Sequence, residues 1–149
     1  MNTSSSQDFQ ARGFRSFLQP KDPQPVVLIM GPNDDSREML RVVLELWNYQ
    51  VLEADNLDDS FLLAENSHPS VILMDTVLPF DDTLDNLTKL RENESVGHTP
   101  SVVLSGFSQA SYRKEAWAHG AECFMVKPID FDALHTYIDT LVKQDERGA

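Results

Sequence analysis

Three residues with chemically active side chains stand at the ends of short apolar runs. They are Asp75, Ser105 and Lys127, and each directly follows three or four consecutive apolar residues. The carboxyl ends of parallel strands form one rim of an α/β sheet, where ligands bind. A carboxylate nucleophile, a hydroxyl that donates to a phosphate oxygen and a neutralising ammonium together suit a phosphoryl group. The trio therefore predicts phosphoryl chemistry at a sheet rim.

Such a rim requires parallel strands, and the pattern from residue 26 onward predicts them. Continuous apolar runs, typical of strands buried on both faces, alternate with segments of helical period. The predicted strands are 26–30, 50–53, 71–74, 101–104 and 122–126. The first predicted helix starts near 34–36, and the other four cover about 57–66, 84–92, 109–119 and 131–143. Asp34, Asp35 or Ser36 is expected to cap the first helix and Ser108 the fourth, which Gly120 ends. Five alternating pairs predict an α/β fold with a parallel sheet covered on both faces.

Residues 1–25 differ in composition from the rest of the chain. Three serines open the segment and three prolines close it, which predicts a flexible tail and linker. The segment also holds four large apolar residues, which are Phe9, Phe14, Phe17 and Leu18. A short amphipathic docking helix over 7–19, weakened by Gly13, is therefore the other interpretation left open. The domain itself is expected over 26–143, with a frayed end at 144–149.

Composition excludes several classes of function. The 149 residues suffice for one domain, and no apolar run approaches the roughly 18 residues of a membrane span. The N-terminus lacks the apolar stretch of a signal peptide, and the single cysteine, Cys123, fits a reducing cytosol. A formal net charge of −12 opposes binding to nucleic acid. We expect a cytoplasmic protein without membrane or nucleic-acid contacts.

Three motifs carry a resemblance to a known family. They are VILMDTVLP around Asp75, TPSVVLSGF around Ser105 and GAECFMVKPID around Lys127. With these motifs in their order, and with separations of 30 and 22 residues between the three side chains, residues 26–143 resemble the receiver domain of bacterial response regulators. Histidine kinases of two-component systems phosphorylate such domains on aspartate.

The resemblance implies a fold and a set of site residues. The fold is the flavodoxin-like (βα)5 three-layer sandwich, with a five-stranded parallel sheet in the order 2-1-3-4-5. Asp75 would be the phosphoacceptor, while Ser105 and Lys127 would bind the phosphate. Phe124 takes the place of the family's switch aromatic, although a plain core role is the alternative. A cis peptide bond is expected between Lys127 and Pro128.

The metal site is where the chain departs from the family. Receivers hold Mg²⁺ with an acidic pair after the first strand, the acceptor aspartate and a backbone carbonyl two residues further on. Aligned without a gap through SREMLR, the acidic pair falls on Gly31 and Pro32, which have no side-chain oxygen. The implied ligands that remain are Asp75 and the Val77 carbonyl, with Asp34 if a bent loop aims it back. Because Mg²⁺ prefers six oxygens, its binding and phosphoryl transfer should both be weakened.

The loop after the acceptor departs from the family as well. Asp81 and Asp82 lie in this loop and could also approach a metal. Thr83 stands where the family usually has glycine, which relieves a turn at little steric cost. The turn must therefore be made differently in this chain.

Two functions remain open, and neither is an enzyme. The first is a signalling receiver that takes a phosphoryl group on Asp75 from a histidine kinase or phosphotransfer protein. It would act through the face formed by 109–119, 122–126 and 131–143, which could also hold a second copy in a homodimer. The second is a pseudo-receiver, a binding module without Mg²⁺-dependent phosphorylation. A haloacid-dehalogenase-like phosphatase would need a second Asp as general acid where Val77 stands. No output domain follows, so the chain acts through a partner or is a fragment.

Overall fold

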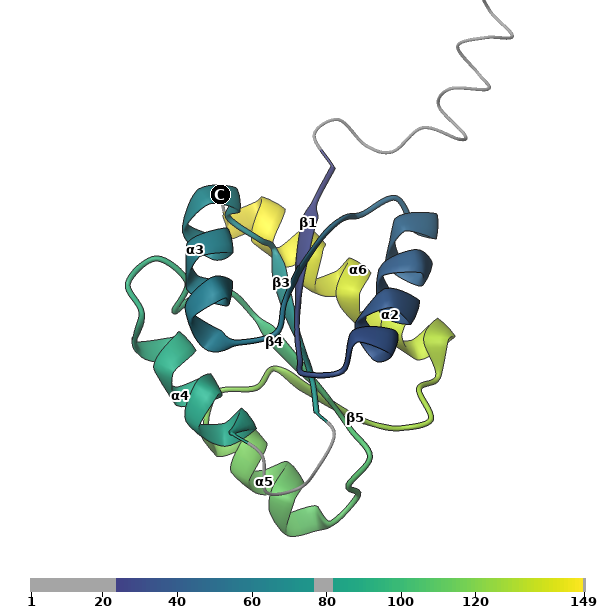
Figure 1. The fold of residues 1–149 in the computed structure, drawn as a ribbon, viewed down its shortest axis with the longest axis vertical. Helices are drawn as coiled ribbons and strands as arrows, with labels where there is room; N and C mark the ends of the chain where they lie inside the picture. Colours follow the sequence, from purple (N-terminus) through teal and green to yellow (C-terminus); the bar gives the residue numbers. More distant parts are fainter. Residues whose placement is uncertain (1–23, 77–81, 149) are drawn as a thin grey trace, which may run out of the picture.

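The computed structural model describes residues 24–76 and 82–148, with side chains as far as Asp145. The strands form one parallel sheet in the order β2-β1-β3-β4-β5 (Figure 1). They are β1 (Val26–Met30), β2 (Gln50–Ala54), β3 (Val71–Asp75), β4 (Ser101–Ser105) and β5 (Cys123–Val126). All four pairings are parallel. The order and direction of the strands confirm the predicted flavodoxin-like α/β fold.

Helices cover both faces of this sheet. They are α2 (Asp34–Leu46), α3 (Leu57–Ser67), α4 (Thr83–Glu92), α5 (Ala110–Ala118) and α6 (Phe131–Gly148). Helices α2 and α6 share one apolar cluster with the sheet, and α3, α4 and α5 share the other. The chain thus has three layers, with β1, β3 and β4 in the middle of the sheet.

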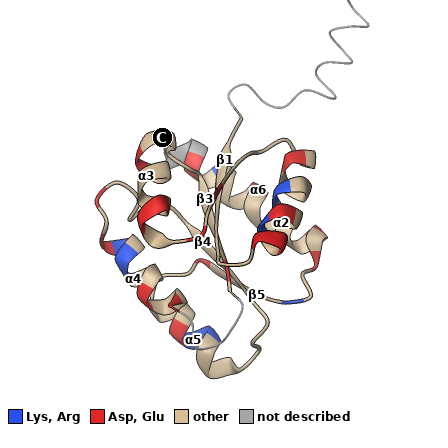
Figure 2. Cartoon of the chain, in the orientation of Figure 1, with Lys and Arg blue, Asp and Glu red and all other residues tan. Residues whose placement is uncertain are grey.

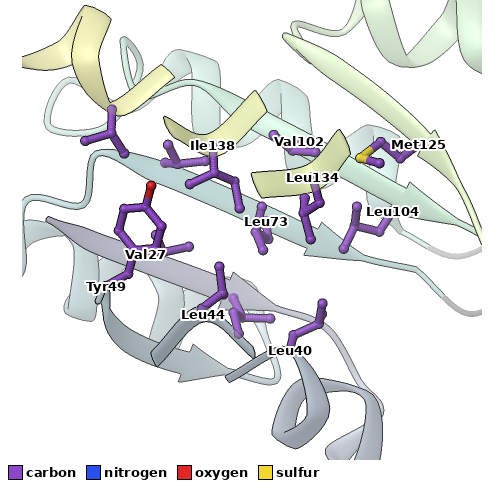
Figure 3. Packing of buried hydrophobic residues seen from close by; sticks show 13 residues of the cluster. Val27, Leu40, Leu44, Tyr49, Leu73, Val102, Leu104, Met125, Leu134 and Ile138 are labelled. Carbon is purple, nitrogen blue, oxygen red and sulfur yellow. The ribbon is translucent and has the colours of Figure 1, made fainter. Parts of the chain in front are cut away.

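The strand sequences explain why both layers form. Side chains alternate across a strand, so Val27 and Ile29 face α2 and α6, while Leu28 and Met30 face the opposite layer. Figure 3 shows the first cluster, where Leu134 and Ile138 of α6 pack over Leu73, Val102 and Leu104. Every residue of β3 and β4 is buried, as continuous apolar runs in a parallel sheet require.

Helix starts differ from the sequence prediction at two places. Helix α2 is capped by Asn33, whose side chain accepts a hydrogen bond from the Ser36 N–H at 2.7 Å, and not by Asp34, Asp35 or Ser36. Helix α5 begins after Gln109 without a side-chain cap, so the prediction for Ser108 was wrong. Gly120 does follow the end of α5, with a φ of 106° that favours glycine.

The two ends of the domain differ in how far the structure describes them. Helix α6 continues to Gly148, five residues beyond its predicted end at 143. Residues 1–23 lie outside the described residues, so both interpretations of the N-terminal segment stay predictions. The described chain starts beside the first residue of β2, where the Gln50 N–H donates to the Pro25 carbonyl at 2.9 Å. Within 24–76 and 82–148, the helices are all too short or too polar to cross a bilayer.

Candidate functional site

The fold brings the three predicted site residues to one edge of the sheet. Asp75 is the last residue of β3, Ser105 is the last residue of β4, and Lys127 directly follows β5. Strand register places Asp75 beside Leu104 and Ser105 beside Val126. The trio therefore lies on three neighbouring strands at their carboxyl ends, as the sequence predicted.

The closest contact of the site joins Lys127 to Asp75. The Lys127 Nζ lies 2.6 Å from Asp75 Oδ1 and also donates to the Thr76 carbonyl at 3.0 Å. The Asp75 side chain is completely buried, while that of Lys127 is 30% exposed. Within the described residues, Asp75 Oδ2 has no hydrogen-bond partner. One carboxylate oxygen is thus paired with the ammonium, and the other is buried without a hydrogen-bond partner in the described part of the chain.

Ser105 is buried, and its hydroxyl bonds to the turn that follows β4. Its Oγ accepts from the Phe107 N–H at 2.9 Å and donates weakly to the Phe107 carbonyl at 3.4 Å. The Ser105 carbonyl accepts from the Lys127 N–H at 2.7 Å, which ties β4 to the end of β5. The peptide bond between Lys127 and Pro128 is cis, as predicted.

An aromatic row connects the Ser105 turn to Phe124. Phe107 and Tyr112 meet edge to face at 5.7 Å, and Tyr112 and Phe124 do the same at 5.8 Å. Such pairs contribute roughly 0.5–1.5 kcal/mol beyond their buried area. The Arg113 guanidinium lies 5.5 Å from the Phe124 ring centre. Sequence reasoning missed Tyr112, whose only signal was an aromatic residue near the start of a helix that ends beside β5.

A cleft of about 350 Å³ opens next to Asp75. Its walls come from the ends of β1, β2 and β3 and from the start of α4: Met30, Gly31, Pro32, Asp55, Asn56, Met74, Asp75, Asp82, Thr83 and Asn86. Sequence reasoning missed Asp55, although a polar residue directly after a strand was the available signal. It also missed Asn86, which only the packing of α4 brings to the rim.

The positions predicted to replace the acidic pair lie against Asp75 itself. Gly31 and Pro32 directly follow β1, and the Gly31 N–H donates to the Ala54 carbonyl at 3.1 Å. A Cβ atom at position 31 would stand 2.6 Å from the Asp75 carbonyl oxygen and 3.0 Å from the Asp75 Cβ. The backbones approach so closely here that glycine is the residue that fits.

Asp34 is turned away from the cleft. Its side chain is 87% exposed and pairs with the guanidinium of Arg37. Arg37 is buried and also donates to the Gly31 carbonyl and, at 3.3 Å, to Glu53. The loop after β1 therefore directs Asp34 toward Arg37 and does not bring it together with Asp75.

These side chains do not make up a Mg²⁺ site. Across the described ranges there is no group of three or more Asp, Glu, His or Cys residues placed to hold a metal ion. Asp75 is the one predicted ligand whose carboxylate is buried at the rim, and it already pairs with Lys127. Asp82 is exposed at the cleft, while Val77 and Asp81 lie outside the described residues.

A comparison with models of known protein families identifies the family of this chain. The model of the response regulator receiver domain matches residues 27–139. This chain belongs to that family. A curated relative, the transcriptional regulatory protein SrrA of Staphylococcus aureus, is 32% identical over 102 residues, which are 68% of this chain and 41% of SrrA. The chain thus spans less than half the length of SrrA.

Solved receiver structures share the fold. The chemotaxis protein CheY4 of Vibrio cholerae superposes with a TM-score of 0.71 at 21% identity, over 79% of this chain and 98% of CheY4. The receiver domain of the sensor histidine kinase PA1611 of Pseudomonas aeruginosa gives 0.70 at 19% identity, over 80% and 98%. That structure holds a magnesium ion in its active-site cleft. Receiver domains are signalling domains that interact with histidine kinases.

Proposed function

We propose that this receiver accepts a phosphoryl group on Asp75 from a histidine kinase or a phosphotransfer protein. The observation that carries the proposal is the state of the Asp75 carboxylate. It is buried, one oxygen is paired with Lys127, and Oδ2 has no hydrogen-bond partner among the described residues. A carboxylate held in this way has lone pairs available for attack on phosphorus.

The chain's own residues account for the main features of the transfer. Asp75 Oδ2 forms the new P–O bond while the P–N bond of the phosphohistidine breaks, and the released imidazole takes up a proton. The Lys127 ammonium offsets negative charge on the phosphoryl oxygens. Ser105 would exchange its bonds to Phe107 for one to a phosphate oxygen. The aromatic row would then transmit this change through Tyr112 to Phe124, the proposed switch residue.

A pseudo-receiver is the second function, and one observation favours it. Gly31 and Pro32 supply no side-chain oxygen at the cleft, and Asp34 pairs with Arg37 instead. Mg²⁺ normally carries much of the charge in phosphoryl transfer, so a poor metal site would slow the reaction. In that case the chain would act by binding a partner without being phosphorylated.

Phosphorylation with acetyl phosphate separates the two functions. The protein is incubated without Mg²⁺ and with rising Mg²⁺, and the intact mass is measured beside the matched variant Asp75→Asn. An increase of about 80 Da, one phosphoryl group, that is absent from the variant supports the phosphoacceptor. Two negative results together would support the pseudo-receiver instead. They are no adduct at any Mg²⁺ concentration and no change in the spectrum of the protein when beryllofluoride is added.

The proposed output is a protein contact and not catalysis. The face of α5, β5 and α6 carries Phe124 and would change its contacts on phosphorylation, with a homodimer as one such contact. We also propose a cytoplasmic location, because a single cysteine fits a reducing compartment. We propose no binding to nucleic acid, because acidic residues outnumber basic ones by 24 to 12 and lie on several helices (Figure 2). Light scattering of the beryllofluoride-treated protein would reveal a dimer.

A further inference from the structure

The outer face of α2 carries an unusual apolar stripe. Met39, Val42 and Leu46 are 47%, 50% and 76% exposed, while Leu40 and Leu44 on the opposite side are buried. Spacings of three and four residues place the exposed side chains in one row along the helix. They account for half of the six large hydrophobic residues exposed in the described ranges. Grouped apolar exposure of this kind marks a contact surface.

The helix that carries the stripe is rich in acidic residues. Helix α2 contains four of them, Asp34, Asp35, Glu38 and Glu45, and only two arginines. Both arginines are paired, Arg37 with Asp34 and, at 3.3 Å, with Glu53 of β2, and Arg41 with Glu38 and, at 2.9 Å, with Glu53. The four acidic residues of α2 and Glu53 still outnumber the two arginines, which leaves a formal charge of −3. Figure 2 shows the acidic segments on α2. A segment that fits this surface should be apolar and basic.

The N-terminal segment has the matching sequence. Residues 7–19 hold Phe9, Phe14, Phe17 and Leu18 together with Arg12 and Arg15. The two arginines against Asp8 give this stretch a formal charge of +1, in a chain whose total is −12. Phe14, Phe17 and Leu18 follow the spacing of one helical face. The stretch is therefore complementary to α2 in both charge and apolar character.

The place where the described chain begins puts this segment within reach. The Gln24 side chain donates to the Asn48 carbonyl at 3.4 Å, and Asn48 stands two residues after Leu46. Six residues from Leu18 to Gln24 can extend roughly 20 Å. The stripe from Met39 to Leu46 is only about 10 Å long. The linker therefore allows the segment to reach the whole stripe of its own domain.

We infer that residues 7–19 dock on the stripe formed by Met39, Val42 and Leu46. Met39 also lines an apolar pocket of about 220 Å³ whose other walls include Asp75 and Lys127. The docking does not depend on the proposed phosphorylation of Asp75.

Disulfide trapping in the full chain tests the docking without any phosphorylation step. In a Cys123→Ser background, Phe14→Cys or Phe17→Cys is combined with Leu46→Cys, and oxidation is followed on non-reducing gels. The matched control pairs the same residues with Leu62→Cys, which is 60% exposed on α3 at the opposite face of the sheet. We expect an intramolecular disulfide to form several-fold faster with Leu46→Cys, at a rate independent of protein concentration.

Two results would overturn the inference. One is equal trapping by the Leu46 and Leu62 pairs, and the other is a product that is mainly intermolecular, which would assign the stripe to a second copy. A separate readout is hydrogen exchange of α2 in the full chain carrying Phe14→Ser and Phe17→Ser. Docking predicts faster exchange along 39–46 and an unchanged rate in α3, whereas unchanged exchange in α2 contradicts it.

Discussion

Substitution of Gly31 by alanine tests the close approach between the end of β1 and Asp75. The added Cβ would meet the Asp75 carbonyl oxygen at 2.6 Å, well inside ordinary contact. The Asp75 carbonyl belongs to the backbone of β3, the central strand of the sheet, so it cannot rotate away as a flexible side chain would. Forcing an extra methyl group into such packing costs about 1–3 kcal/mol.

Gly106→Ala is the matched control for this substitution. A Cβ at position 106 would have no heavy atom within 4 Å. Both substitutions reduce the freedom of the unfolded chain equally, an effect of about 0.4–1 kcal/mol in favour of folding. The difference between the two variants therefore isolates the steric cost at Gly31, which we expect to be about 2 kcal/mol.

Urea unfolding followed by circular dichroism measures this difference. For a domain of this size, about 2 kcal/mol corresponds to a midpoint lower by about 1 M for Gly31→Ala than for Gly106→Ala. The slope of the free energy against urea should be the same in both variants. Equal midpoints would refute the argument, because they would mean that the sheet absorbs the methyl group freely.

Three further predictions concern single contacts. Lys127→Met leaves Asp75 buried without its cation, so we expect the free energy of unfolding at pH 7 to fall by about 3 kcal/mol. Urea unfolding measures this loss, and an unchanged midpoint would contradict the buried pair. The hydrogen bond from Lys143 lowers the pKa of Asp139, so this carboxylate stabilises the fold above its ordinary pKa and loses that effect as pH falls through the lowered value. Lys143→Met should raise the pKa of Asp139 in an NMR titration, and no rise would refute the assignment. Burial raises the pKa of the Cys123 thiol, so at pH 8 this thiol should react more slowly with a thiol reagent in the folded protein than in the protein unfolded by urea. Equal rates in the two states would count against burial.

The sequence predicted the fold because its signals are local and repeated. Every strand except β2, whose sequence is QVLEA, contains a run of at least three apolar residues, and four of the five strands begin at the predicted residue. Helix caps were less predictable, because Asn33, Asp34, Asp35 and Ser36 are consecutive and each can accept a capping bond. The direction in which the chain leaves β1 selects Asn33, and that direction depends on tertiary packing.

The site was predictable only where it consists of strand ends. Asp75, Ser105 and Lys127 could be found because the end of an apolar run marks the rim. Asn86 and Tyr112 lie on helices, and their positions at the cleft and in the aromatic row depend on how α4 and α5 pack. Asp34 could not be judged from spacing alone, because its partner Arg37 is fixed by Glu53 on a neighbouring strand.

The absence of a side-chain oxygen at position 31 and the close packing at β1 can be understood as one feature. A carboxylate at position 31 requires a Cβ, and that Cβ would collide with the backbone of the acceptor aspartate. Gly31→Asp would therefore displace Asp75, the proposed phosphoacceptor. Position 32 differs, because Pro32 is exposed at the cleft wall. A carboxylate introduced there with Pro32→Asp would add a metal ligand without disturbing Asp75, so the two substitutions should have opposite effects on Mg²⁺ affinity.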